Sequence, residues 1–168
     1  YKKALDSAFT DPLTGAQNRA AMDQALTREI ELSRRQDNPL SIILLDADHF
    51  KAINDTYGHS HGDEVLKAIA QVTRQTIRQS DVLYRFGGEE FVVLLVNTDI
   101  EQSKSIAERI RSGIEHFNFS DTAPGLHVTV SIGMANYKQY KSIQETLMTA
   151  DNRMYKAKEQ GRNKIIFE

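Results

Sequence analysis

Carboxylate side chains gather at two points of the sequence where apolar runs meet polar ones. Residues 87–91 read Gly-Gly-Glu-Glu-Phe and lie between two apolar runs, residues 82–84 and 92–96. Two glycines between short apolar runs are typical of a β-hairpin turn. The adjacent Glu89 and Glu90 repel one another unless a cation or a proton lies between them. Considered alone, these residues fit a metal-binding tip and a solvated acidic turn equally well.

The second group of carboxylates follows residues 40–45, a nearly continuous apolar run of strand length. Such a run predicts a central strand that is buried on both faces, and it ends in Asp46 and Asp48. If the hairpin lies beside this strand, all these carboxylates converge on one edge of the sheet. Hard oxygen ligands suit Mg²⁺ or Mn²⁺. For Asp48, the alternative is an ordinary cap on the following helix.

Cations and polar side chains that could hold a nucleotide lie in three places. Lys51 follows the strand at a predicted helix start, where backbone N–H groups favour phosphate. Lys158 and Arg162 end the last predicted helix, although cations there also complement the helix dipole. Asn54 and Asp63 flank a glycine-containing loop, and their side chains match the donors and acceptors of guanine. Helix capping explains these two residues equally well.

Composition excludes several classes of protein. A chain of 168 residues with 40% hydrophobic residues suits one globular domain. The net charge of −2, without a basic run, argues against a nucleic-acid surface. There are no cysteines for disulfides or thiolate metal sites, and the five histidines lack zinc-site spacing. No apolar stretch approaches the roughly 20 residues that cross a bilayer.

The order of elements predicts an α+β fold. Helices are expected at about 18–35, 50–54, 63–79, 99–116 and 142–161, and strands at 40–45, 82–84, 92–96, 126–136 and 164–167. The Gly-Gly hairpin pairs two neighbouring strands directly, which disfavours a doubly wound parallel sheet. The simplest arrangement is a central, mainly antiparallel sheet with helices packed on it and a βαββαβ (ferredoxin-like) kernel.

Several blocks of the sequence resemble a known family. Residues 85–91, Arg-Phe-Gly-Gly-Glu-Glu-Phe, resemble the signature of the GGDEF-domain diguanylate cyclases, with the common Glu variant in its third place. Residues 11–19 resemble the opening D-x-L-T-x-x-x-N-R of the family, and residues 46–63 resemble its D-x-D-x-F-K…N-D…G-H…G-D stretch. Residues 131–133 and 150–163 match later blocks. The likeness covers essentially the whole chain in the right order.

The resemblance implies a diguanylate cyclase, in which two GTP molecules condense to cyclic di-GMP with release of pyrophosphate. It also implies five strands in the sheet, as in the palm of nucleotidyl cyclases. Asp46, Glu89 and Glu90 would be catalytic, and together with the Ala47 carbonyl they would bind Mg²⁺ or Mn²⁺. The substrate-binding residues that the likeness implies are Phe50, Lys51, Asn54, Asp63, Lys158 and Arg162. Because each domain holds one GTP, activity should require a two-fold homodimer.

A product-inhibition site is a further expectation. Arg78 and Asp81 have the R-x-x-D spacing, with five residues between Asp81 and Gly87, that resembles the inhibitory site of many family members. Arginine can bind guanine or phosphate oxygens in a bidentate manner, and aspartate can accept from guanine. A helix-ending arginine followed by a strand-opening aspartate is the simpler alternative. Arg109, on the next helix, is a candidate second contributor.

The organisation of the parent protein is also an expectation. We expect residues 1–10 to end a linker helix from a missing N-terminal region, and residues 11–168 to form one catalytic domain. That region would promote pairing and supply any membrane anchor, whereas the domain itself would be cytoplasmic. A catalytically silent module that binds GTP or cyclic di-GMP is the alternative function, although such modules usually have an altered signature. A purely structural dimerisation module would leave the acidic residues unexplained.

Overall fold

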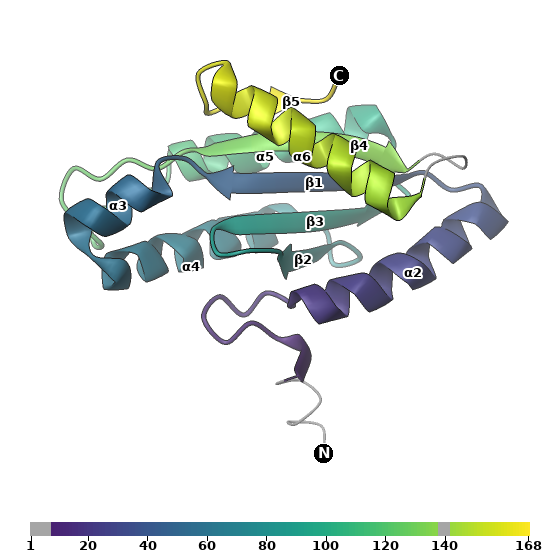
Figure 1. Cartoon of the computed structure of the whole chain (residues 1–168), viewed down its shortest axis with the longest axis horizontal. Coiled ribbons are helices and arrows are strands. Elements are labelled where there is room, and N and C mark those ends of the chain that lie inside the picture. The colour runs from purple at the N-terminus through teal and green to yellow at the C-terminus, as the bar shows by residue number, and fades with distance from the viewer. Residues whose placement is uncertain (1–7, 138–141) are drawn as a thin grey trace.

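The computed structural model describes residues 8–137 and 142–168, and its centre is one five-stranded sheet (Figure 1). The strands are β1 (Leu40–Ala47), β2 (Val82–Arg85), β3 (Glu90–Val96), β4 (Val130–Tyr137) and β5 (Ile165–Ile166). Their order across the sheet is β2-β3-β1-β4-β5. The first three pairings are antiparallel, and only β4 with β5 is parallel. The predicted α+β fold with a mainly antiparallel five-stranded sheet is therefore confirmed.

Strand β1 is the centre of the core. All eight of its residues are buried, because β3 and β4 flank it and helices cover both faces of the sheet. Ile42 and Leu44 face the side covered by α2 (Arg19–Gln36) and α6 (Ile143–Glu159), which are in front in Figure 1. Ile43 and Leu45 face the other side, which α4 (His59–Thr76) and α5 (Ile100–Glu115) cover.

The segment after β1 differs from the prediction. Residues 57–63 are not a loop: α3 (Phe50–Tyr57) and α4 are separated only by Gly58, whose φ of 94° turns the chain between them. The Gly58 N–H donates to the Asn54 carbonyl, and the Gly62 N–H donates to the Gly58 carbonyl. Asn54 and Asp63 therefore lie on two packed helices rather than on either side of a flexible loop.

Other boundaries shift by a few residues. The strand predicted from residue 126 begins at Val130, and α6 ends before Gln160 rather than at Gly161. Ser142 caps α6, because its side chain accepts from the Glu145 N–H at 3.1 Å.

The amino-terminal part precedes α2. Residues 8–9 are helical, Thr10 pairs in a short bridge with Gln17, and residues 1–7 of the expected linker helix lie outside the described residues. Among the described helices, none combines the length and apolar character needed to cross a membrane.

Candidate functional site

The hairpin tip and the end of β1 meet at one edge of the sheet. Asp46 lies opposite Glu90 in the antiparallel register of β1 and β3. The Ala47 N–H donates to the Glu89 carbonyl over 3.3 Å, and the Phe86 N–H closes the turn onto the Glu90 carbonyl at 2.9 Å. The two groups of carboxylates therefore come together, as a hairpin beside the central strand requires.

Asp46 is the most unusual residue at this edge. Asp46 is 4% exposed, and its Oδ2 lies 2.9 Å from Nζ of Lys158 on α6. Its Oδ1 is buried and has no hydrogen-bond partner among the residues that the structure describes. Burial raises the pKa of this carboxyl to about 7, with further contributions from the charges of Glu89 and Glu90, although the ammonium of Lys158 opposes the rise.

Glu90 belongs to the same electrostatic environment. Burial raises the pKa of the Glu90 carboxyl, and the charge of Asp151 on α6 adds to the effect. Excess negative charge with one orphaned buried oxygen is an arrangement that a divalent cation would stabilise. No group of three or more His, Cys, Asp or Glu side chains among the described residues is placed to hold a metal alone. Carboxylate oxygens are ligands that suit hard divalent cations, which keep waters and take other ligands from phosphates.

Asp48 lies only two residues from Asp46 but has a different environment. Its carboxylate accepts from Thr129 Oγ1 at 2.7 Å, from Ser131 Oγ at 2.6 Å and from the Asn163 N–H at 3.1 Å. The suggested helix cap is wrong, because the N-cap of α3 is His49 and α3 has no side-chain cap in the described chain. Asp48 therefore joins β1 to β4 and to the turn after α6.

The residues expected to bind guanine lie on the α3–α4 pair. Asn54 Oδ1 is buried and has no hydrogen-bond partner among the described residues, while the Asp63 side chain is exposed. A Cβ atom on Gly62 would lie 1.9 Å from Asn54 Oδ1 and 3.2 Å from Phe50 Cζ. The absence of a side chain at Gly62 thus makes room for the Asn54 amide, and the buried Phe50, which is 9% exposed, lies beside the same position.

The expected phosphate-binding cations are distributed around the acidic edge. Lys158 is in direct contact with Asp46. Lys51 is exposed in the first turn of α3, which begins shortly after β1 ends. Arg162 is exposed in the turn after α6, and the residue that follows it donates to Asp48. Helix α6 therefore places Lys158 directly against Asp46, whereas Lys51 and Arg162 are exposed on the segments that follow β1 and α6.

Arg78 and Asp81 are bound to one another. Arg78 Nε donates to Asp81 Oδ2 at 2.9 Å and Arg78 Nη2 to Asp81 Oδ1 at 3.0 Å, and Nη2 also reaches the carbonyl of Val96. The Asp81 side chain is fully buried, whereas that of Arg78 is 46% exposed. Both residues line an open cavity of about 360 Å³. Arg109 of α5 donates to the carbonyl of Thr76, the last residue of α4, at 3.2 Å.

The ion pair between Arg85 and Asp11 supports the hairpin, and the sequence alone predicts no role for it. Arg85 Nη1 lies 3.2 Å from Asp11 Oδ1, and its Nη2 donates to the Gly88 carbonyl at 2.7 Å. Asp11 also accepts from the N–H and the hydroxyl of Thr14. Arg85 therefore ties the tip of the hairpin to the turn before α2. An arginine two residues before the first of the two glycines is the available signal, but its partner Asp11 is far away in sequence.

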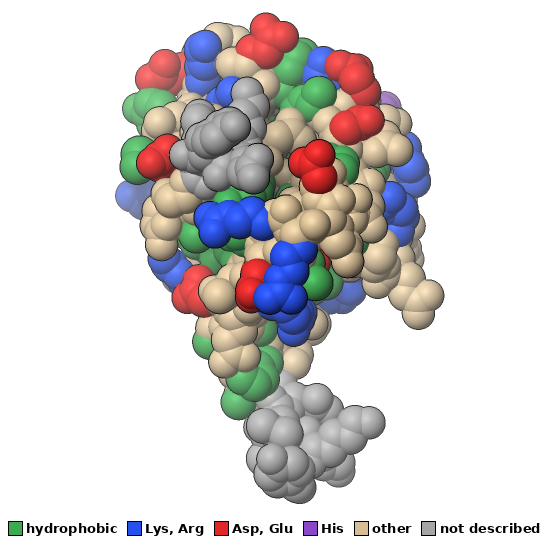
Figure 2. Space-filling model, turned by 90° about the vertical axis from the view of Figure 1, so that its right-hand side faces the viewer, with side chains coloured by type: hydrophobic (Ala, Val, Ile, Leu, Met, Phe, Trp, Pro, Cys, Tyr) green, Lys and Arg blue, Asp and Glu red, His purple; other side chains and the backbone are tan. Residues whose placement is uncertain are grey.

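Figure 2 shows the end of the molecule at which α2 finishes. On this face, Lys and Arg side chains are interspersed with Asp and Glu side chains, and hydrophobic atoms are scattered in small groups.

Comparison with known proteins agrees with this geometry. The family model described as "Diguanylate cyclase, GGDEF domain" matches residues 8–164. Diguanylate cyclase DgcP of Pseudomonas aeruginosa is 42% identical over 158 residues, which are 94% of this chain and 24% of DgcP. The chain spans less than half of the length of this and other curated relatives that it matches.

Solved structures give the same result. The coiled coil and GGDEF domain of DgcB from Caulobacter crescentus, in complex with c-di-GMP, superposes with a TM-score of 0.93 at 29% identity, covering 99% of this chain and 89% of that one. The active GGEEF domain of a diguanylate cyclase from Vibrio cholerae gives a TM-score of 0.79 at 33% identity, covering 83% and 89%. With the acidic hairpin of residues 87–91 beside Asp46, the chain belongs to the GGDEF-domain diguanylate cyclase family.

Proposed function

We propose that this domain condenses two GTP molecules into cyclic di-GMP and pyrophosphate. The observation that carries the proposal is the buried Asp46. One of its oxygens has no hydrogen-bond partner among the described residues, the other contacts Lys158, and the Glu89–Glu90 hairpin tip lies beside it. The family and the names of the relatives support the same chemistry. The Vibrio cholerae domain, which is described as active, is a GGEEF domain like this one, so a Glu in the third place is compatible with catalysis.

The acidic edge would hold Mg²⁺ or Mn²⁺ through Asp46, the Ala47 carbonyl and Glu89, with Glu90 supporting them. A bound ion supplies positive charge that stabilises the attacking and leaving oxygens of phosphoryl transfer. Lys158 lies against Asp46 and is the cation best placed to neutralise substrate phosphates at this edge. Lys51 and Arg162 would hold the remaining oxygens of the triphosphate from either side.

The reaction needs a hydroxyl and a phosphate from different GTP molecules. The 3′ oxygen of one GTP forms a bond to the α-phosphorus of the other, and the bond from that phosphorus to pyrophosphate breaks. The hydroxyl proton passes to the acidic pair or to solvent. The 3′ oxygen of the second GTP then bonds to the α-phosphorus of the first, which releases the second pyrophosphate and closes the ring. Because one domain has one such edge, we infer that two chains meet face to face as a homodimer.

Guanine would be recognised on the α3–α4 pair. The buried Asn54 Oδ1 lacks a partner within the described chain, and an unpaired buried carbonyl is costly unless a ligand donates to it. Guanine offers N–H donors from which Asn54 and the exposed Asp63 can accept, and Phe50 and Asn54 both lie beside Gly62. Adenine does not present the same donors to a carboxylate, so we infer a preference for GTP over ATP.

Product inhibition at Arg78 is the regulatory part of the proposal. The half-exposed guanidinium of Arg78 lines an open cavity, in which it can bind guanine or phosphate oxygens of cyclic di-GMP. Asp81 is buried and paired with Arg78, so we infer that it orients this guanidinium or is released from it on binding. Arg109 would contribute from α5. Calorimetry would test this, because cyclic di-GMP binding that survives Arg78→Ala would contradict it.

The curated relatives are longer than the part of them that this chain matches. We infer that an N-terminal region controls pairing and supplies any link to a membrane. A catalytically silent module that binds GTP or cyclic di-GMP is the second candidate. The intact acidic hairpin favours the enzyme over this alternative.

The decisive experiment incubates the purified domain with GTP and Mg²⁺, or Mn²⁺, and measures cyclic di-GMP and pyrophosphate. Asp46→Ala and Glu89→Ala should abolish product. Glu64→Gln, which changes an exposed acid of α4 paired with Lys67, should leave the rate unchanged. Wild-type protein that binds GTP but forms no product at micromolar concentration would support the silent module instead.

A further inference from the structure

The turn that follows α6 has an unusual backbone. Arg162 has a φ of 65° and Asn163 a φ of 47°, so two successive residues other than glycine are left-handed. Each such residue costs on the order of 1 kcal/mol and persists only where its surroundings hold it. Asparagine tolerates this conformation better than most residues, whereas arginine gains nothing from it. Contacts from elsewhere in the fold must therefore stabilise the turn.

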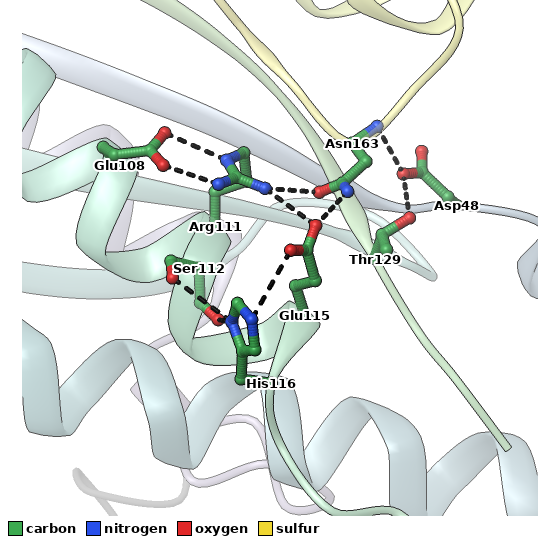
Figure 3. A network of polar contacts seen from close by, with 8 residues as sticks. All are labelled: Asp48, Glu108, Arg111, Ser112, Glu115, His116, Thr129 and Asn163. Carbon is green, nitrogen blue, oxygen red and sulfur yellow. Dashed lines mark hydrogen bonds and ion pairs between the residues drawn. The ribbon is translucent and has the colours of Figure 1, made fainter. Parts of the chain in front are cut away.

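Asn163 provides those contacts on three sides (Figure 3). Its backbone N–H donates to Asp48 Oδ2 at 3.1 Å. Its Oδ1 accepts from Arg111 Nη1 at 2.8 Å, and its Nδ2 donates to Glu115. Arg111 and Glu115 both lie in the last turns of α5, while Asp48 follows β1. The turn is thus held between a helix and the central strand.

Arg111 is the centre of this network. Its side chain is 16% exposed and is paired with two acids of its own helix. Nε lies 2.9 Å and Nη2 2.5 Å from the oxygens of Glu108, and Nη1 lies 3.0 Å from Glu115 Oε2. Glu108 is more exposed than Arg111 and makes no bond to Asn163 among the contacts of Figure 3. Arg111 and Glu115 therefore contact the turn directly, whereas Glu108 contacts only Arg111.

We propose that Arg111 and Glu115 are positioning residues for the triphosphate: by holding Asn163 they fix the left-handed turn that presents Arg162. Asp48 ties the same turn to the end of β1, two residues beyond Asp46. This inference rests on the proposed function, which places Arg162 and Lys158 on the phosphates of GTP. Neither α5 residue touches the substrate, and their effect passes through Asn163 and Arg162.

The physical reason is preorganisation. An exposed arginine on a loosely held turn loses backbone and side-chain freedom when it binds phosphate, and this loss weakens binding. A turn whose backbone is already fixed leaves only the side chain to be ordered. Without the α5 contacts, the two left-handed residues can relax to ordinary dihedral angles, which would redirect the Arg162 side chain.

The test is a double-mutant cycle on the binding of a non-hydrolysable GTP analogue with Mg²⁺, measured by calorimetry. Arg111→Ala should weaken binding about tenfold, which corresponds to about 1.4 kcal/mol. In an Arg162→Ala background, the same change should have little further effect, because residues that act through one another are not additive. Glu108→Gln, at the other partner of Arg111, is the matched control and should leave affinity unchanged.

Two further variants distinguish weaker binding from a loss of folding. Asn163→Gly keeps a residue that adopts the left-handed angle freely but removes the side-chain bonds to α5, so it should weaken binding while thermal unfolding stays cooperative. Arg111→Lys keeps the charge but not the forked geometry, and should restore affinity only in part. The inference is overturned if Arg111→Ala weakens binding equally with and without Arg162, or if Asn163→Gly binds like wild type. A wild-type domain that binds GTP without forming product would refute the proposed reaction but leave this cycle measurable.

Discussion

At the residue scale, Asp46 lies in a site that suits a cation, and ionising its carboxyl is unfavourable when no cation is bound. The carboxyl is buried, one of its oxygens has no partner within the described chain, and its pKa is raised to about 7. Lys158 offsets only part of the cost of ionising it. Residues at functional sites commonly oppose stability in this way, because they are arranged for a ligand rather than for the fold.

The metal-free domain should therefore lose stability as the pH rises. Between the unfolded pKa of about 4 and the folded pKa of about 7, the folded state holds a proton on Asp46 that the unfolded state has released. Raising the pH through this window favours unfolding. Asp46→Asn removes the ionisation and should stabilise the domain at pH 8 by about 1–3 kcal/mol, with a smaller effect at pH 5.

Urea unfolding in EDTA at both pH values measures this difference. Glu64→Gln, which removes an exposed acid, is the control and should change stability little at either pH. A gain for Asp46→Asn that is equal at pH 5 and pH 8 would show that the ionisation of Asp46 is not the cause.

Gly62 gives a second prediction at the residue scale. It lies inside α4, where alanine is normally more stable than glycine by about 0.5–1 kcal/mol. A Cβ there would meet the Asn54 side chain, which can swing away at small cost. Gly62→Ala should therefore leave the melting temperature nearly unchanged but raise the KM for GTP about tenfold. Ser60→Ala, at an exposed position in the first turn of α4, is the matched control, and an unchanged KM for Gly62→Ala would separate Asn54 from guanine binding.

The contact between α6 and β4 is the critical one at the scale of elements. A Cβ on Gly133 would lie 2.0 Å from the Ala150 carbonyl oxygen and 2.3 Å from the Met154 nitrogen, both backbone atoms of α6. The helix therefore rests directly on the strand, and this contact sets the depth at which Lys158 reaches Asp46. Backbone cannot move aside as a flexible side chain can.

Gly133→Ala should accordingly destabilise the fold by more than about 2 kcal/mol. Denaturant unfolding measures the loss, and any protein that remains folded should have a lower kcat because α6 carries Lys158. Gly88→Ala, in the hairpin turn, is the control for stability, since a Cβ there meets no atom of the described chain within 4 Å. Equal stability of the two variants would mean that α6 can shift freely over β4.

Local signals in the sequence predict most helices and strands, but they do not predict every contact between residues that are distant along the chain. The apolar run of residues 40–45 indicates a strand buried on both faces, and the two glycines at 87–88 indicate the hairpin that lies beside it. Asp48 is ambiguous in the sequence, because its partners Thr129 and Asn163 are distant along the chain. Glycine and polar residues dominate residues 57–63 and favour a loop, yet one glycine turn and packing on α3 suffice to keep them helical.

At the scale of the whole molecule, the sheet presents one acidic edge and one helix pair proposed to bind guanine, which together provide for one GTP. The proposed reaction joins two. Two copies must therefore bring their edges together, and the concentration of that encounter complex sets the rate.

Turnover per chain should fall when the domain is diluted from micromolar to nanomolar concentration, because dilution separates the two half-sites. A tandem protein in which a flexible linker joins two copies raises their effective concentration to about the millimolar range, so its turnover should fall much less over the same dilution. Measuring pyrophosphate release across this range for both proteins makes the comparison direct. If the single-copy domain kept a constant turnover per chain down to nanomolar concentration while remaining monomeric by light scattering, one chain would bind both GTP molecules, and the face-to-face arrangement would be wrong.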